Sequence, residues 1–157
     1  MMTVMVETPR LQSAKYVFDE KEKRLRFKKS LPLGMVFPYD FGMIPSTRAE
    51  DGDPADALVI AEFACAPGIE IECRLIGALL AEQSSAGKKA VRNDRYFFIP
   101  KESRAFAHIN NVSDFSGKHN QELEAFFVQY NSVEGKEFTP IKWVDAEKAA
   151  DILKSAF

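Results

Sequence analysis

The chain has 157 residues, of which 46% are hydrophobic and 28% are charged. This length and composition are ordinary for a globular protein with one sizeable core, so we expect a single domain over residues 1–157. The formal net charge of -2 gives no basic footprint for nucleic acid, and no apolar run approaches the ~20 residues that span a bilayer, so neither partner is expected.

The first residues, 1–6, contain no basic leader and no long apolar stretch before a cleavage site, so no secretory signal is expected. Cys65 and Cys73 form neither a CxxC pair nor a disulfide framework. Buried free thiols in a reducing compartment are the simplest interpretation. We therefore expect a cytoplasmic protein.

Strand-like runs dominate the first two-thirds of the chain. Residues 14–19 and 23–28 flank a charged turn, and Leu25 and Phe27 alternate with basic residues, which predicts a β-hairpin. Further strands, several of them bounded by Gly or Pro, are predicted at residues 35–39, 57–61, 69–80, 92–99 and 139–144.

Two helices are predicted in the last third. Over residues 120–130 the apolar side chains are spaced as on one helical face, and they are Leu123, Phe126, Phe127 and Tyr130. A second helix is predicted from Ala146 to Ser155, with Asp145 as its N-cap. Its predicted inward side chains are Ala149, Ile152, Leu153 and Phe157.

Short strands with two helices predict a mainly β protein with flanking helices, an OB-like closed β-barrel with two helices packed on it. OB barrels also bind oligonucleotides through aromatic side chains on a basic groove. Here most of the thirteen Phe have core-like spacing and the charge balance is acidic, which disfavours that use.

Three carboxylates, Asp51, Asp53 and Asp56, lie within six residues, immediately before the apolar run 57–61. Carboxylate oxygens are ligands of hard cations such as Mg²⁺, which often connect a protein to a phosphate. A solvated acidic turn is the simpler interpretation of such a motif alone. An EF-hand is excluded, because the sixth position of the loop is Asp56 and not Gly.

The segment Asp51-Gly-Asp-Pro-Ala-Asp56, followed by an apolar strand, resembles the signature of the soluble family I inorganic pyrophosphatases. The resemblance covers nearly the whole chain, and the other matching segments are Val6-Glu-Thr-Pro9, Lys15-Tyr16, Phe37-Pro-Tyr-Asp-Phe-Gly42, Ala66-Pro-Gly-Ile69, His108-Ile-Asn-Asn-Val-Ser-Asp114, Phe126-Phe127, Tyr130 and Trp143. It implies an OB-like barrel that hydrolyses pyrophosphate to two phosphates with several Mg²⁺ ions. Because bacterial members commonly form hexamers, a homo-oligomer is expected.

The resemblance also implies roles for individual residues. Asp51 and Asp56 would be metal ligands, with Asp56 bridging two ions, and Asp53 would be the base that helps generate the attacking hydroxide. Glu7 would order metal-bound water in a second layer. The residues implied to contact phosphate oxygens are Lys15, Tyr130 and Lys29, the last standing where the family usually has Arg.

The strand before Pro100 departs from the family pattern. An ungapped alignment puts Asn93 where the family has a metal-binding Asp and Arg95 where it has a Lys. A neutral amide still offers Mg²⁺ an oxygen, and Arg95 keeps a positive charge for phosphate. A one-residue bulge would instead bring in Asp94 and move Arg95 away. We favour the ungapped register.

Other family residues are also replaced. Val17 stands in place of a Glu, Asn131 in place of a Lys, and Phe37 and Phe41 in place of tyrosines. Residues 83–89 contain no acid for the remaining family carboxylate; the nearest candidate is Glu82, and Tyr39 is a candidate for replacing a lost hydroxyl. Fewer carboxylates predict weaker binding of Mg²⁺.

Three functional hypotheses follow. The first is a Mg²⁺-dependent inorganic pyrophosphatase. The second is a diverged family member with weak or no hydrolysis that binds phosphate, a nucleotide or a protein partner. The third is hydrolysis of another phosphoanhydride or phosphoester, because Phe37 and Phe41 remove polar groups from the expected pocket.

Overall fold

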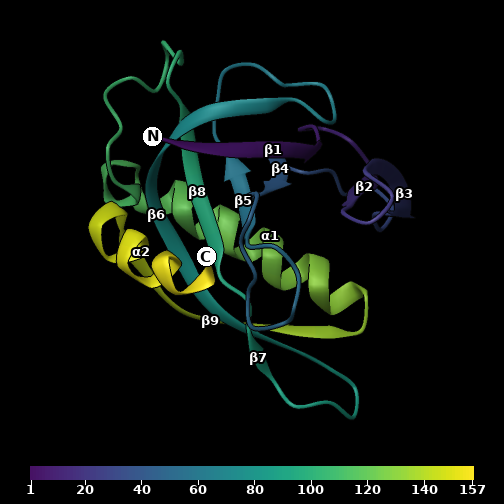
Figure 1. The fold of residues 1–157 in the computed structure, drawn as a ribbon. Coiled ribbons are helices and arrows are strands. Elements are labelled where there is room, and N and C mark those ends of the chain that lie inside the picture. Colours follow the sequence, from purple (N-terminus) through teal and green to yellow (C-terminus); the bar gives the residue numbers. More distant parts are fainter.

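The computed structural model describes residues 1–157 and is built mainly of strands (Figure 1). The strands are β1 (Met2–Thr8), β2 (Ala14–Asp19), β3 (Arg24–Ser30), β4 (Asp40–Met43), β5 (Asp56–Val59), β6 (Glu70–Ser85), β7 (Val91–Arg92), β8 (Arg95–Pro100) and β9 (Lys136–Asp145). The helices are α1 (Gly117–Val133) and α2 (Ala146–Leu153), with single 3-10 turns η1 (Val112–Asp114) and η2 (Lys154–Ala156). Neither α-helix is long and apolar enough to cross a membrane.

Five strands close into a barrel. Hydrogen-bonded neighbours follow the order β1, β4, β5, β8 and β6, and β6 returns to pair with β1. The long strand β6 also pairs with β7 and β9. All pairs are antiparallel except β5 with β8, which run parallel. This closed ring confirms the predicted OB-like barrel with two helices.

The predicted hairpin forms, as β2 and β3, but it is a separate two-stranded sheet. It is tied to the end of β1 by hydrogen bonds from its backbone to side chains of the barrel. The Tyr16 N–H donates to Thr8 Oγ1 at 2.9 Å, and the Phe18 N–H donates to Glu7 Oε2 at 2.7 Å. Figure 1 shows the hairpin on the opposite side of the barrel from α2.

Both faces of the barrel wall are apolar, which lets a helix pack on each. Successive side chains of a strand point to opposite faces. On β8, Phe97 belongs to one buried cluster with Phe127 of α1, and Phe98 belongs to a second with Leu153 of α2. Burying an apolar side chain of this size contributes about 1.5–3 kcal/mol. These contacts fix α1, which carries Tyr130, against the barrel.

Some element boundaries differ from the prediction. The strand expected at 35–39 does not form; this segment contains Pro38, which has no N–H to donate to a ladder, and the next strand is β4 at Asp40–Met43. Strand β1 was not predicted, and α1 is longer than expected. Phe157, expected to face inward, is 65% exposed because it follows the last helical turn and ends the chain.

Candidate active site

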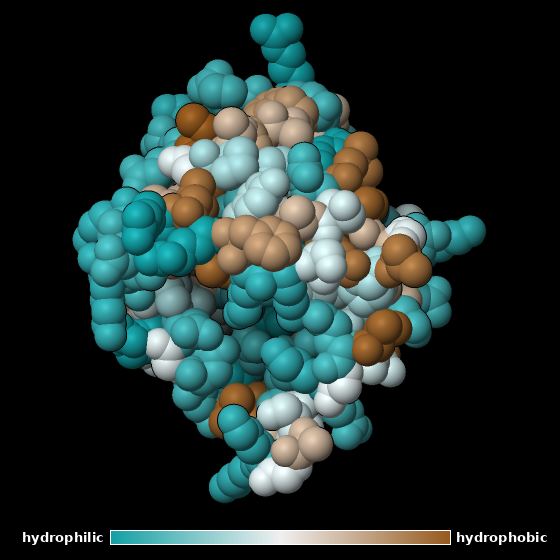
Figure 2. Space-filling model, turned by 90° about the vertical axis from the view of Figure 1, so that its right-hand side faces the viewer, coloured by the Kyte–Doolittle hydropathy of each residue, from teal (hydrophilic) through white to brown (hydrophobic).

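A pocket of about 320 Å³ lies where the barrel, the β2–β3 hairpin and α1 meet, and it is lined by charged side chains. Its carboxylates are Glu7, Asp51, Asp53 and Asp56. Its cations are Lys15, Lys28, Lys29, Arg95 and Lys136. Asn93 and Tyr130 also line it, so all nine residues that the sequence singled out lie in this pocket, together with Lys28 and Lys136, which it did not single out. Figure 2 shows a hollow on this face of the molecule with mainly hydrophilic residues around it.

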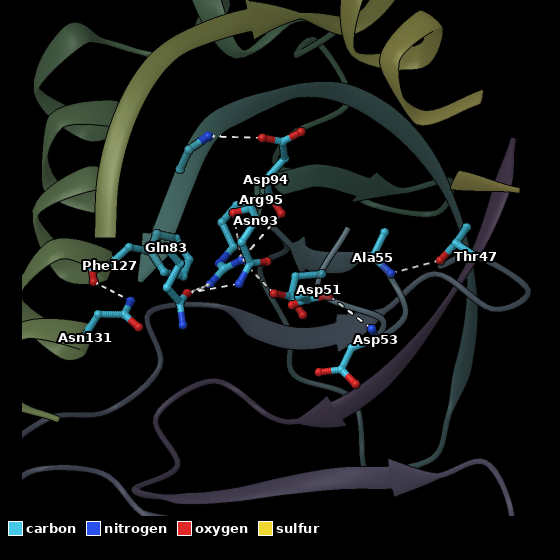
Figure 3. A network of polar contacts seen from close by, with 12 residues as sticks. Thr47, Asp51, Asp53, Ala55, Gln83, Asn93, Asp94, Arg95, Phe127 and Asn131 are labelled. Atoms are coloured by element: carbon cyan, nitrogen blue, oxygen red, sulfur yellow. Dashed lines mark hydrogen bonds and ion pairs between the residues drawn. The ribbon is translucent and has the colours of Figure 1, made fainter. Parts of the chain in front are cut away.

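The loop between β4 and β5 presents two of the acids at the rim. Its Gly52 has φ +91°, a left-handed conformation that glycine adopts without a steric penalty. The Ala55 N–H donates to Thr47 Oγ1 at 2.9 Å, and the Asp53 N–H donates to Asp51 Oδ1 at 3.0 Å (Figure 3). Burial raises the pKa of Asp51, and the hydrogen bond from Asp53 partly offsets this. The turn therefore holds both carboxylates beside the pocket.

The third acid is paired with a buried arginine. Asp56 on β5 is the register partner of Arg95 on β8, and Arg95 Nη1 lies 2.6 Å from Asp56 Oδ2. The same Nη1 donates to Asn93 Oδ1 at 2.6 Å, while Nη2 donates to Gln83 Oε1 at 3.3 Å (Figure 3). One guanidinium thus joins three oxygen-bearing side chains of the pocket wall.

The structure follows the ungapped register along this segment. The pairing of β5 with β8 runs without a shift, and Asn93 and Arg95 both line the pocket. Asp94 does not line it: its carboxylate accepts hydrogen bonds from Arg92 Nη2 at 2.9 Å and from the Ala81 N–H at 3.0 Å. Asp94, in the two-residue break between β7 and β8, is thus held by contacts outside the pocket.

The hairpin supplies the basic side of the pocket. Lys15 and Lys29 are register partners on β2 and β3. Burial lowers the pKa of Lys15 to about 8, and its Nζ lies 5.3 Å from the centroid of the Phe41 ring. Lys29 Nζ donates to Glu134 Oε1 at 2.6 Å. Lys15 is therefore the less neutralised of these two cations.

Glu7 lies deep in the pocket and is only 7% exposed. Burial raises the pKa of its carboxyl to about 7, although the hydrogen bond from the Phe18 N–H opposes the shift. The side chain therefore holds a proton at pH values at which an ordinary carboxyl is ionised.

The residues that replace family residues do not all lie in the pocket. Val17, Phe41 and Asn131 line the pocket, whereas Phe37 is buried outside it, 5.1 Å from the Phe41 ring between centroids. Asn131 Nδ2 donates to the Phe127 carbonyl of its own helix at 2.8 Å (Figure 3). One N–H of its amide is therefore engaged within α1.

Two expectations about neighbouring side chains are wrong. Glu82, the nearest candidate for the missing acid, is exposed and lies outside the pocket. Its neighbour Gln83 lines the pocket instead, because β6 places alternate side chains on opposite faces. The Tyr39 hydroxyl lies 2.9 Å from His119 Nε2 and does not reach the pocket.

Three polar lining residues were not predicted from the sequence: Gln83, Lys28 and Lys136. Lys28 gave a signal, since it adjoins Lys29 on a strand that was predicted correctly. Lys136 gave none, because only the folded arrangement of α1 and β9 brings the start of β9 beside the hairpin.

Two buried side-chain polar atoms make no hydrogen bond of good geometry, and both belong to pocket residues. They are Arg95 Nε and Tyr130 Oη. An unpaired buried polar group costs about 1–3 kcal/mol, so natural proteins seldom keep one without a use. Both groups are hydrogen-bond donors. They fit a ligand that offers acceptor oxygens.

The carboxylate oxygens at the rim are of the type that binds a hard divalent cation, but they are too few to coordinate one fully. No group of three or more His, Cys, Asp or Glu side chains lies close enough to hold a metal ion by itself. Mg²⁺ usually keeps several waters and binds one or two carboxylates together with phosphate oxygens. The donor set therefore fits an ion whose coordination is completed by water and a phosphate ligand.

Comparison with known proteins gives the same family from sequence and from structure. The family model described as inorganic pyrophosphatase matches residues 4–157. An inorganic pyrophosphatase of Thermus thermophilus is 32% identical over 155 residues, which covers 97% of this chain and 86% of the relative. One of Saccharolobus solfataricus is 33% identical over 144 residues, with coverage of 91% and 78%. The crystal structure of a Thermus thermophilus inorganic pyrophosphatase superposes with a TM-score of 0.89 at 29% identity, covering 98% of this chain and 87% of that one. The chain therefore belongs to the inorganic pyrophosphatase family.

Proposed function

We propose that this protein hydrolyses inorganic pyrophosphate to two phosphates with the help of Mg²⁺. The observation that carries the proposal is that the two unpaired buried donors, on Arg95 and Tyr130, line a pocket that also holds four carboxylates. Pyrophosphate offers acceptor oxygens to the donors, and a divalent cation makes its charge compatible with the acids. Membership of the family supports the same substrate.

In this proposal the basic side of the pocket holds the phosphate oxygens. Lys15, Lys29, Arg95 and Tyr130 are the proposed contacts. With a pKa of about 8, Lys15 carries its charge at neutral pH. Fixed donors around a phosphoryl group stabilise the charge that spreads over its oxygens during transfer, and they cost no reorganisation at that moment.

The acidic side supplies the proposed oxygen ligands, which are Asp51 and Asp56. Asn93, which the resemblance implies as a third ligand, uses its Oδ1 to accept a hydrogen bond from Arg95 Nη1 at 2.6 Å. Bound Mg²⁺ would polarise the phosphoryl oxygens and acidify the attacking water. The carboxylate of Asp53 is exposed at the rim, and no ion pair or hydrogen bond engages its oxygens. It is therefore free to take a proton from that water as a general base. Glu7, deeper in the pocket, would orient metal-bound water.

We also propose that the chain forms a homo-oligomer. Large apolar side chains remain exposed outside the pocket, among them Leu11 at 65%, Leu33 at 104% and Ile69 at 47%. Contact between copies would remove such groups from water. Light scattering coupled to size exclusion measures the mass, with a hexamer as the assembly to test first.

The direct test is phosphate release from pyrophosphate by the purified protein across a Mg²⁺ titration, beside Asp53→Asn. Saturable, Mg²⁺-dependent release that is lost in the variant is the expected result. Equal background release from both proteins at high Mg²⁺ would overturn the proposal and leave a binding role for the pocket.

A further inference from the structure

We infer that the guanidinium of Arg95 occupies the place of one divalent cation in the pocket. The chain therefore binds one ion fewer than the same pocket would bind if Arg95 were absent. The inference rests on the proposed Mg²⁺ dependence of the site. It adds that part of the cationic charge needed by a phosphate ligand is supplied by the chain itself.

The first support is the identity of the oxygens that Arg95 engages. Its Nη1 lies 2.6 Å from Asp56 Oδ2 and 2.6 Å from Asn93 Oδ1. Asp56 and Asn93 are two of the three residues that the family resemblance implies as ion ligands. A divalent cation bound to the same atoms would stand beside the guanidinium charge and be repelled by it. Asp56 thus keeps one free oxygen for an ion, and it cannot bridge two ions through both.

The second support is that the guanidinium is held in place. Arg95 is 5% exposed, and the centroids of the Phe127 and Phe138 rings lie 5.3 and 5.2 Å from its Cζ. An aromatic face stabilises a cation at this range, and a planar guanidinium stacks on it. The charge therefore cannot swing out of the pocket as an exposed lysine would.

The orientation of the Asn93 amide is also fixed. Its Nδ2 donates to Gln83 Oε1 at 3.0 Å, and the same Oε1 accepts from Arg95 Nη2 at 3.3 Å. Reversing the amide would place its N–H donors next to the N–H donors of the guanidinium. The Oδ1 atom therefore faces Arg95 and accepts its hydrogen bond. This contact explains the neutral side chain at Asn93, which accepts a hydrogen bond from Arg95. A carboxylate at the same position would compete with Asp56 for the guanidinium.

The charge balance agrees. Five cationic side chains face four carboxylates in the pocket, and one of the cations, Lys29, is also paired with Glu134 at 2.6 Å, so the formal charges balance without any metal ion. Carboxylates that side-chain cations already balance hold each divalent ion less tightly than carboxylates without such neighbours.

The test counts bound Mn²⁺, used as the probe for Mg²⁺, by electron paramagnetic resonance of the free ion in the absence of pyrophosphate. We expect Arg95→Gln to bind one Mn²⁺ per chain more than the wild type. The matched control is Arg92→Gln, which removes a neighbouring arginine that pairs with Asp94 outside the pocket. It should bind the same number as the wild type. Equal counts for Arg95→Gln and the wild type would overturn the inference.

A second measurement needs no variant, in case Arg95→Gln does not fold. Crystals of the wild type soaked in Mn²⁺ should show no anomalous peak within coordination distance of Asn93 Oδ1, whereas a peak there would overturn the inference. Neither measurement depends on hydrolysis. An extra Mn²⁺ in Arg95→Gln together with no phosphate release by the wild type would sustain this inference and reject the proposed function.

Discussion

The parallel pairing of β5 with β8 sets Asp56 beside Arg95, and their side chains meet at 2.6 Å. Both are withdrawn from water, with side-chain exposures of 24% and 6%. Removing one partner of such a pair leaves the other charge buried without compensation. The ion pair is therefore a structural element of the pocket as well as a part of its chemistry.

Asp56→Asn should abolish Mg²⁺-dependent phosphate release and lower the free energy of unfolding by about 3 kcal/mol, because Arg95 loses its counter-charge. Enzyme assays and urea denaturation measure the two effects. Asp94→Asn is the matched control, since that carboxylate pairs with Arg92 outside the pocket and its loss should leave turnover largely intact. Full turnover in Asp56→Asn would remove the residue from the site.

Tyr130→Phe should lower kcat/KM for pyrophosphate by about tenfold, the effect of one lost hydrogen bond of about 1.4 kcal/mol. The melting temperature should change little, because the hydroxyl makes no hydrogen bond of good geometry, although burial and the nearby Glu134 carboxylate raise the pKa of Tyr130. Tyr39→Phe is the control: its hydroxyl contacts His119 away from the pocket, so kcat/KM should hold. A drop in melting temperature without a kinetic change would show that the Tyr130 hydroxyl serves the fold.

Lys136→Met should raise KM several-fold with a smaller change in kcat, because the side chain adds charge to the pocket without a proposed part in the chemistry. Lys142→Met, on the same strand but exposed and outside the pocket, is the comparison. Steady-state kinetics at low and high salt distinguish the two, since the Lys136 effect should shrink as salt screens the charge. Identical behaviour of both variants would exclude Lys136 from anion binding.

Glu7 should make the metal-free protein less stable as the pH rises from about 4.5 to about 7. The unfolded chain releases this proton near 4.5 and the folded chain holds it until about 7, so between these values the folded state binds more protons. The total loss is about 3 kcal/mol, at about 1.4 kcal/mol per pKa unit. Urea unfolding with a chelator present should show a flatter pH dependence for Glu7→Gln, and parallel curves would contradict the assignment.

Local sequence patterns predicted an element correctly where its apolar residues repeat with the period of a strand or of a helix. The alternation in the hairpin and the apolar face that contains Phe127 and Tyr130 predicted β2, β3 and the middle of α1, because their spacing repeats that of a strand or a helix. Strand β1 was not predicted, although its buried Val4 and Val6 are spaced as on one face of a strand. Its pairing with both β4 and β6 comes from closure of the barrel, which is a tertiary effect.

The site was predictable in membership but not in contacts. The acid motif and the resemblance led to nine residues that do meet in one pocket. The ion pair of Asp56 with Arg95 and the unpaired hydroxyl of Tyr130 depend on strand register and burial, which spacing along the chain does not reveal. Lys136 is separated from the hairpin lysines by more than a hundred positions, and only packing brings them together.

The hairpin that carries Lys15, Lys28 and Lys29 shares no strand ladder with the barrel that carries the acids. Its backbone amides should therefore exchange with solvent through local opening, at lower free energy than those of β5 and β8. An anion that contacts both sides would join the two sheets into one cooperative unit and slow exchange in the hairpin. Rigidity in this molecule would then be a property of the loaded pocket, acquired with the ligand and released with the product.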